Sequence, residues 1–186
     1  FHPGEAVFQG FLINPIDGNS YLAKMYQGWR GSWHFRLPYT VEPGEGAYLF
    51  LYYIFLGHLA RWTGLSLILV YHLARWLGGL FMLWSLVRFY TSLGFKGNLL
   101  TAALVLSAVG AGMGWLVFFS GNFTADFWVA EAYPFLSAYT NPHFPLALGL
   151  ILCLLSGFSG QSFQKRSSWN LTLLGLAVAT LLLAII

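Results

Sequence analysis

Charged side chains are scarce in this sequence, and so is cysteine. Asp, Glu, Lys and Arg make up 8% of the 186 residues, whereas soluble domains carry about a quarter. The formal net charge of +3 is small and its basic residues are scattered, which argues against nucleic acid as a partner. The one cysteine, Cys153, excludes a disulfide framework and a cysteine-based metal cluster. We expect its side chain to be a small buried hydrophobe.

Apolar residues dominate the rest of the chain. Hydrophobic residues make up 58%, aromatic residues 19%, and the mean hydropathy is +0.66. Runs of about 20 apolar residues, enough to cross the hydrocarbon core of a bilayer, recur along the sequence. Their bounds are 65–90, 99–120, 144–160 and 169–186, with 47–62 as a fifth run of marginal length. The sequence therefore predicts an all-α fold, a polytopic transmembrane helical bundle.

The two ends of the chain and its polar first quarter indicate how it is organised. It begins at Phe1 and ends within an apolar run at Ile186, so we expect a fragment of a longer membrane protein. Residues 1–46 are predicted to be an extracytoplasmic loop that carries a short amphipathic helix at the membrane interface. Residues 47–186 are predicted to be the transmembrane helical region.

Basic residues indicate which loops face the cytoplasm. They flank the two short breaks that follow the runs 65–90 and 144–160, and they are Arg88, Lys96, Lys165 and Arg166. Because cytoplasmic loops carry an excess of Lys and Arg, both breaks are predicted inside. The loop 121–141, which has two acidic residues and no basic one, is then outside.

The sidedness of the first loop depends on the run 47–62. If this run crosses the bilayer, the acidic residues of the first loop and of 121–141 face opposite compartments. If it is re-entrant or interfacial, they share one side. Its short length, together with His58 and Arg61, favours an incomplete crossing.

The five residues HLARW occur twice, at 58–62 and 72–76. In each copy His and Arg are three residues apart and share a helix face. Arg75 would lie well inside the membrane, where a charge generally finds a partner or a polar cavity. Either Arg75 makes a structural pair within the bundle while Arg61 reaches toward the interface, or these arginines contact an anionic substrate.

Three of the six acidic residues lie in the first loop, and they are Asp17, Glu42 and Glu45. The stretch DGNS that begins at Asp17 indicates a break followed by a helix cap. Apolar residues then recur at helical spacing over 21–30, which is typical of a helix lying in the headgroup region. Asp17 is either an N-cap or a functional carboxylate, and the two glutamates are either solvated loop charges or ligands.

The second acidic loop places Asp126 and Glu131 among aromatic residues. Carboxylates and aromatic rings together suit a sugar site, although an interfacial aromatic belt with two solvated acids has the same composition. The next helix is expected to begin at His143, after an Asn-Pro pair that favours a helix start. Its imidazole is either an interface contact or a phosphate or metal contact. Gly110 and Gly114 are expected to form a helix-packing surface.

The order of these features resembles the N-terminal region of the GT-C superfamily of integral-membrane glycosyltransferases. It is nearest to the branch of protein O-mannosyltransferases and aminoarabinose transferases. In those enzymes a loop Asp follows the first transmembrane helix, a polar motif with Pro precedes the second, and a later external loop carries a further acid. Asp17, Glu42 or Glu45, and Asp126 fall in that order. The segment EPGEG replaces the His or Lys with paired prolines that is frequent in the branch, and the tight Asp-x-Asp pair is absent.

The resemblance implies transfer of a sugar from a polyprenyl-phosphate donor to an acceptor at the external membrane face. Asp17 would be the catalytic base, and cations would stabilise the departing phosphate. The substrate-binding candidates are Glu42, Glu45, Asp126, Glu131, Lys24, Arg30, Arg36, His34 and His143. A divalent metal ion is one option for a cofactor, with Asp17 and Asp126 as candidate ligands.

The expected location is a prokaryotic plasma (inner) membrane, with membrane lipids as further partners. The oligomeric state, the sugar and the acceptor stay open. The alternative functions are a membrane transporter or flippase and a noncatalytic membrane protein.

Overall fold

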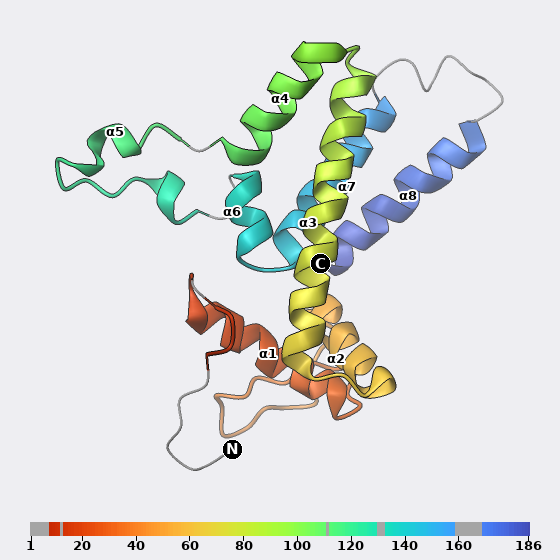
Figure 1. The fold of residues 1–186 in the computed structure, drawn as a ribbon. Coiled ribbons are helices and arrows are strands. Elements are labelled where there is room, and N and C mark those ends of the chain that lie inside the picture. The colour runs from red at the N-terminus through yellow and green to blue at the C-terminus, as the bar shows by residue number, and fades with distance from the viewer. Residues whose placement is uncertain (1–7, 12, 111, 130–132, 159–168) are drawn as a thin grey trace. The chain divides into compact units, whose positions relative to one another are not determined.

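The computed structural model describes residues 8–11, 13–110, 112–129, 133–158 and 169–186. Their regular secondary structure is entirely helical, which confirms the all-α prediction (Figure 1). The chain divides into two compact units, Phe1–His72 and Leu73–Ile186, and each is described by itself. The helices are α1 Pro15–Trp29, α2 Leu51–Thr63, α3 Leu67–Ser92, α4 Gly97–Val109, α5 Trp115–Phe118, the 3₁₀ helix η1 Ala125–Phe127, α6 Pro134–Tyr139, α7 His143–Phe158 and α8 Trp169–Ile185.

The first unit is built on a close contact between α1 and α2. The two helices meet at Gly28 and Gly57, both of which are buried. A Cβ atom on Gly28 would collide with the carbonyl oxygen of Ile54, and one on Gly57 would collide with that of Met25. Only glycine therefore allows the two backbones to touch here. The side chains of Met25 and Ile54, both 0% exposed, complete the contact.

Helix α1 begins earlier than the sequence suggested. Its first residue is Pro15, and its N-cap is Asn14, whose side chain accepts a hydrogen bond from the Asp17 N–H. Proline at the first helical position is already fixed near helical φ, which favours a start here. The expected break and cap over 17–20 is wrong, because these residues belong to the helix. The spacing of apolar residues over 21–30 predicted the helix correctly but did not show where it begins.

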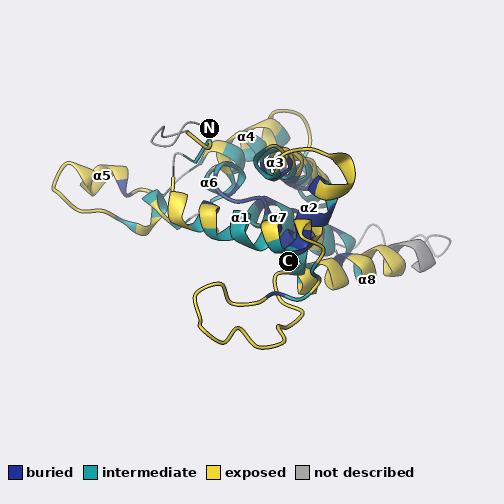
Figure 2. Ribbon diagram, turned by 90° about the horizontal axis from the view of Figure 1, so that it is seen from below, coloured by how far each residue is buried: buried dark blue, intermediate teal, exposed yellow. Residues whose placement is uncertain are grey.

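The length of helix α2 bears on whether the run 47–62 crosses the bilayer. It has 13 residues, so it is about 20 Å long, whereas the hydrocarbon core is about 30 Å thick. Residues 47–50 are not helical, because Ala47 is paired with Phe35 through two backbone hydrogen bonds of 2.8 and 3.0 Å. The loop before α2 is exposed from Arg36 to Phe50, as the yellow colouring of Figure 2 shows. By itself α2 is too short to cross a bilayer.

Helix α3 is, among the described residues, the one helix long and apolar enough to cross a membrane. It has 26 residues, and 28% of its most apolar window is buried. Most of that window is therefore accessible, and the polytopic bundle predicted from the sequence is not confirmed by this one helix. Three shorter apolar helices lie in the second unit: α4, α7 and α8.

Helices α3 and α7 pack closely within the second unit. A Cβ atom on Gly149 would lie 2.7 Å from the Phe81 ring and 3.2 Å from the Met82 Cα atom. Farther along the pair, the Ser85 hydroxyl and the Cys153 thiol are 3.3 Å apart. Cys153 is half-buried in this contact rather than fully buried.

Arg75 has a structural partner. Its guanidinium donates a hydrogen bond of 2.9 Å to the carbonyl oxygen of Tyr139 and lies 5.7 Å from the centre of that residue's ring. This arrangement confirms the interpretation of Arg75 as a structural pair within the helices of this unit.

The predicted run 99–120 is not one helix. Helix α4 ends at Val109, and the glycine-rich stretch after it does not form a helix-packing surface. A Cβ atom on Gly112 would lie 2.7 Å from the Asp126 carboxylate, and one on Gly114 would collide with it. The glycines are therefore needed where the loop folds around Asp126, which explains both the end of the helix and the wrong prediction. Lys165 and Arg166 lie outside the described residues.

The α1–α2 contact predicts that Gly57→Ala destabilises the first unit. The added methyl group has no space between two backbones, so overpacking should cost about 1–3 kcal/mol or more. Thermal unfolding in detergent, followed by circular dichroism, measures the change. Gly175→Ala is the matched control, since nothing lies within 4 Å of a Cβ atom there and alanine favours a helix. Equal unfolding temperatures for both variants would contradict the contact.

Candidate functional site

Lys24 projects from α1 into a small cleft with aromatic walls. Its ammonium nitrogen lies 4.3 Å from the centre of the Tyr21 ring and 4.1 Å from that of the Phe50 ring. It also donates a hydrogen bond of 3.2 Å to the Ser20 hydroxyl one turn earlier. The cleft has a volume of about 200 Å³, and it is lined by Ser20, Ala23, Lys24, Phe35, Leu37, Pro38, Tyr39 and Phe50. Lys24 is thus a cation held by two aromatic faces at the wall of an open cleft.

Asp17 shares this face of α1. It lies seven residues before Lys24, which is two turns or about 10 Å along the helix axis. Burial lowers the pKa of Lys24 below the ordinary value of 10.5, and the negative charge of Asp17 opposes that shift. The folded state thus penalises the charged ammonium, and stability rises with pH between the lowered pKa and 10.5. The two side chains sense each other electrostatically without forming an ion pair.

Backbone strain is concentrated at the same site. Among the described residues, only two that are not glycine have positive φ: Asn14 at 50° and Phe50 at 53°. Asn14 contacts Asp17, because its amide donates to the carboxylate, and the Phe50 ring lies against Lys24. Left-handed conformations cost an aromatic residue such as Phe50 about 1–3 kcal/mol and cluster at functional sites. Asparagine adopts this region readily, so the strain lies at Phe50, beside Lys24.

The loop between Phe35 and Ala47 supplies Leu37, Pro38 and Tyr39 to the cleft, and it carries both predicted glutamates. Gln27 of α1 holds its start, since its amide exchanges hydrogen bonds of 2.8 and 2.9 Å with the Arg36 backbone. Arg36 Nε then donates to the carbonyl oxygen of Glu45 at 3.4 Å. Glu42 and Glu45 are exposed on this loop, whose ends are joined by the pairing of Phe35 with Ala47. Neither glutamate lines the cleft itself.

The other two candidates of this unit serve mainly its local structure. His34 is held by hydrogen bonds between its backbone and the Ser32 hydroxyl, and its ring packs edge-on against Tyr48 at 4.4 Å. Arg30 is the exposed C-cap of α1, and its guanidinium lies 5.9 Å from the centre of the Tyr26 ring.

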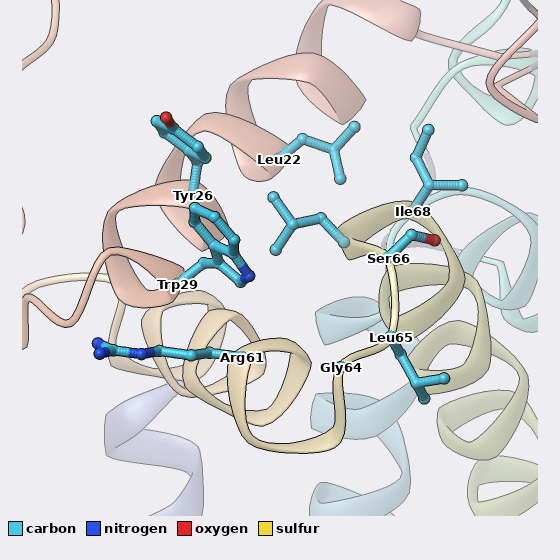
Figure 3. A pocket seen from close by; sticks show the side chains of 9 residues that line it. Leu22, Tyr26, Trp29, Arg61, Gly64, Leu65, Ser66 and Ile68 are labelled. Carbon is cyan, nitrogen blue, oxygen red and sulfur yellow. The ribbon is translucent and has the colours of Figure 1, made fainter.

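A larger cleft of about 690 Å³ lies on another part of the first unit (Figure 3). Tyr26 and Trp29 of α1 stand on one side of it, and the turn after α2 forms the other. The Arg61 side chain of α2 extends past Trp29 along its rim. From the sequence, Arg61 was expected to reach toward the membrane interface or to contact an anionic substrate. Its place beside α1 was not predicted, because it depends on how the two helices pack.

In the second unit, Asp126 organises its own loop. Its carboxylate accepts hydrogen bonds from the Thr124 hydroxyl and from the Gly114 N–H, the latter at 2.8 Å. These bonds, that of Thr124 most strongly, lower the pKa of Asp126, so the side chain stays charged. Two donors at one carboxylate give it a structural role in addition to any role with a ligand. Glu131, the other acidic candidate of this loop, lies outside the described residues.

His143 begins α7, as predicted, and its ring packs 4.1 Å from that of Phe144. Among the described residues, no three His, Cys, Asp or Glu side chains are grouped as metal ligands would be. Asp17 lies in the first unit and Asp126 in the second, and both stay candidate metal ligands.

Comparison with known proteins identified no relative of this chain. The chain matches no protein-family model, and no curated protein or solved structure resembles it at a significant level.

The cleft predicts a reactive amine at Lys24. Because burial lowers its pKa, acetylation by acetic anhydride should reach half its maximal rate below pH 10.5. Peptide mass spectrometry across a pH series measures this midpoint for Lys24. Phe50→Ala should open the cleft to water and move the midpoint upward. A midpoint at or above 10.5 in the unaltered protein would contradict the burial of this ammonium.

Proposed function

We propose that this chain is the N-terminal part of a membrane glycosyltransferase that uses a polyprenyl-phosphate-linked sugar donor. The observation that carries the proposal is the face of α1 shared by Asp17 and Lys24. A carboxylate and a partly desolvated ammonium lie about 10 Å apart along this face, beside an aromatic cleft, with the strained Phe50 backbone next to the ammonium. Sugar transfer needs this combination, one group to take a proton and one to hold a phosphate.

The membrane part of the proposal rests on α3, with α4, α7 and α8 as shorter apolar helices of the same bundle. Helix α1 and the short α2 then form a layer at the surface of the bilayer. Tyr26, Trp29 and Trp62 are exposed on this unit, and amphipathic aromatics of this kind are enriched at membrane interfaces. A prokaryotic plasma membrane is the proposed location.

In the proposed reaction, Asp17 accepts the proton of the acceptor group as that group attacks the anomeric carbon. The bond between the anomeric carbon and the phosphate oxygen breaks, and the leaving phosphate gains negative charge. Lys24 stabilises that charge, and the low polarity of the cleft strengthens the interaction. In this proposal Glu42 and Glu45, on the exposed loop that follows the cleft residues, accept hydrogen bonds from sugar hydroxyls.

Other candidates contribute less to the proposal. Asp126 and His143 stay candidate substrate contacts of the second unit, and Arg30, His34 and Arg36 stay candidate phosphate contacts. A transporter is the weaker alternative, because the intramembrane charge that suggested it, Arg75, is engaged with Tyr139.

Transfer activity tests the proposal. The full-length protein is assayed in membranes with undecaprenyl-phosphate mannose, by release of undecaprenyl phosphate, with and without EDTA. Asp17→Asn should lower the rate about 10²- to 10⁴-fold, the usual contribution of a catalytic base, and Lys24→Gln should lower it about tenfold or more. Lys96→Gln, an exposed lysine at the start of α4, is the control and should leave the rate unchanged. Full activity of a folded Asp17→Asn protein would refute the base assignment.

A further inference from the structure

The cleft beside Arg61 has the composition of a site for an amphiphile. Most of its lining is apolar or aromatic, from Leu22, Tyr26 and Trp29 of α1 and from Leu65 and Ile68 after α2 (Figure 3). One cation, Arg61, stands at its rim. No carboxylate lies within ion-pair distance of the Arg61 guanidinium in the parts of the chain that the structure describes. An apolar trough with one uncompensated guanidinium suits a molecule that has an apolar chain and an anionic head.

Gly31 lies against one side of this guanidinium. It follows Arg30, the C-cap of α1, and adopts φ of +100°, a conformation that favours glycine. A Cβ atom on it would lie 2.5 Å from Arg61 Nη1, so glycine leaves more space around the cation than a larger residue would. The Arg61 side chain is exposed as a whole. Its five N–H donors can therefore receive a phosphate in the bidentate manner that guanidinium groups favour.

The position of the cleft along the chain identifies the source of the amphiphile. The cleft is lined by residues 64–68, which end α2 and begin α3, the helix long enough to cross a bilayer. The start of such a helix lies where the hydrocarbon gives way to headgroups. Trp62 and Trp29 are 64% and 44% exposed, and exposed tryptophans are enriched at membrane interfaces.

We propose that the Arg61 cleft binds an anionic phospholipid of the surrounding membrane. Arg61 contacts the phosphate, and an acyl chain lies along Leu22, Leu65 and Ile68. The bound lipid holds the α1–α2 pair at the bilayer surface. This inference rests on the part of the proposed function that places α3 across a membrane, but it is independent of sugar transfer.

Native mass spectrometry of the full-length protein tests the inference. The protein is purified in detergent and titrated with phosphatidylglycerol, with phosphatidylcholine or with undecaprenyl phosphate. Phosphatidylglycerol should be retained in preference to phosphatidylcholine, and Arg61→Gln should weaken its binding roughly tenfold, as expected for loss of a charged hydrogen-bonded contact. Arg61→Lys should keep part of the binding. Lys96→Gln, with the same change in charge at the other end of α3, should not alter it.

A second variant tests the apolar part of the cleft. Leu22→Trp fills the trough without changing charge, and it should displace the lipid while the helix content, followed by circular dichroism, is kept. Equal binding by wild type and Arg61→Gln, or equal retention of phosphatidylcholine, would overturn the inference. Retention of undecaprenyl phosphate but not of phosphatidylglycerol would overturn it too, in favour of a donor site. If the protein were absent from carbonate-washed membranes, the membrane assignment of the proposed function would fail separately.

Discussion

The backbone contact between Gly28 and Gly57 is the constraint on which the first unit depends. Neither glycine can gain a methyl group without collision, so the pairing of α1 with α2 requires small residues on both helices. This pairing gives α1 a fixed support, and α1 in turn presents Asp17 and Lys24 on one face. It also places Arg61 of α2 beside the C-terminal end of α1, where the larger cleft lies. Both candidate sites therefore follow from one helix crossing.

The strained backbone of Phe50 and the partly desolvated Lys24 ammonium, at the smaller cleft, depend on the support that α2 gives to α1. Phe50 holds a left-handed conformation and packs its ring against the Lys24 ammonium. An isolated loop would relax from this conformation, because it costs about 1–3 kcal/mol. The pairing of Phe35 with Ala47 and the hydrogen bonds from Gln27 restrain the loop on both sides. A rigid, partly dry lysine site at a polar surface is thus consistent with a role in binding a phosphate.

The sequence allowed prediction of whatever rests on composition and periodicity. The all-α class, the long apolar helix α3 and the amphipathic face of α1 were predicted, because each depends only on the residues within one segment of the chain. The start of α1 was missed because the DGNS stretch pointed to a helix boundary there, although Asn14-Pro15 is the same kind of pair that marks the start of α7. The end of α4 was missed because Gly112 and Gly114, which follow the helix, lie against the Asp126 carboxylate. Asp126 is twelve residues beyond Gly114, so the sequence did not show this contact. The Gly28–Gly57 crossing and the place of Arg61 depend on tertiary packing, which a single sequence does not reveal.

The central claim is that α1 and α2 form a layer at one membrane surface, so that α2 does not cross the bilayer. Cysteine labelling at the two ends of α2 tests it most directly, with Tyr48→Cys and Trp62→Cys introduced one at a time into a Cys153→Ser background. In sealed membrane vesicles of known orientation, an impermeant maleimide should label both positions from the same side. Lys96→Cys, beyond α3, should be labelled only from the other side. Labelling of Tyr48→Cys and Trp62→Cys from opposite sides would contradict the account.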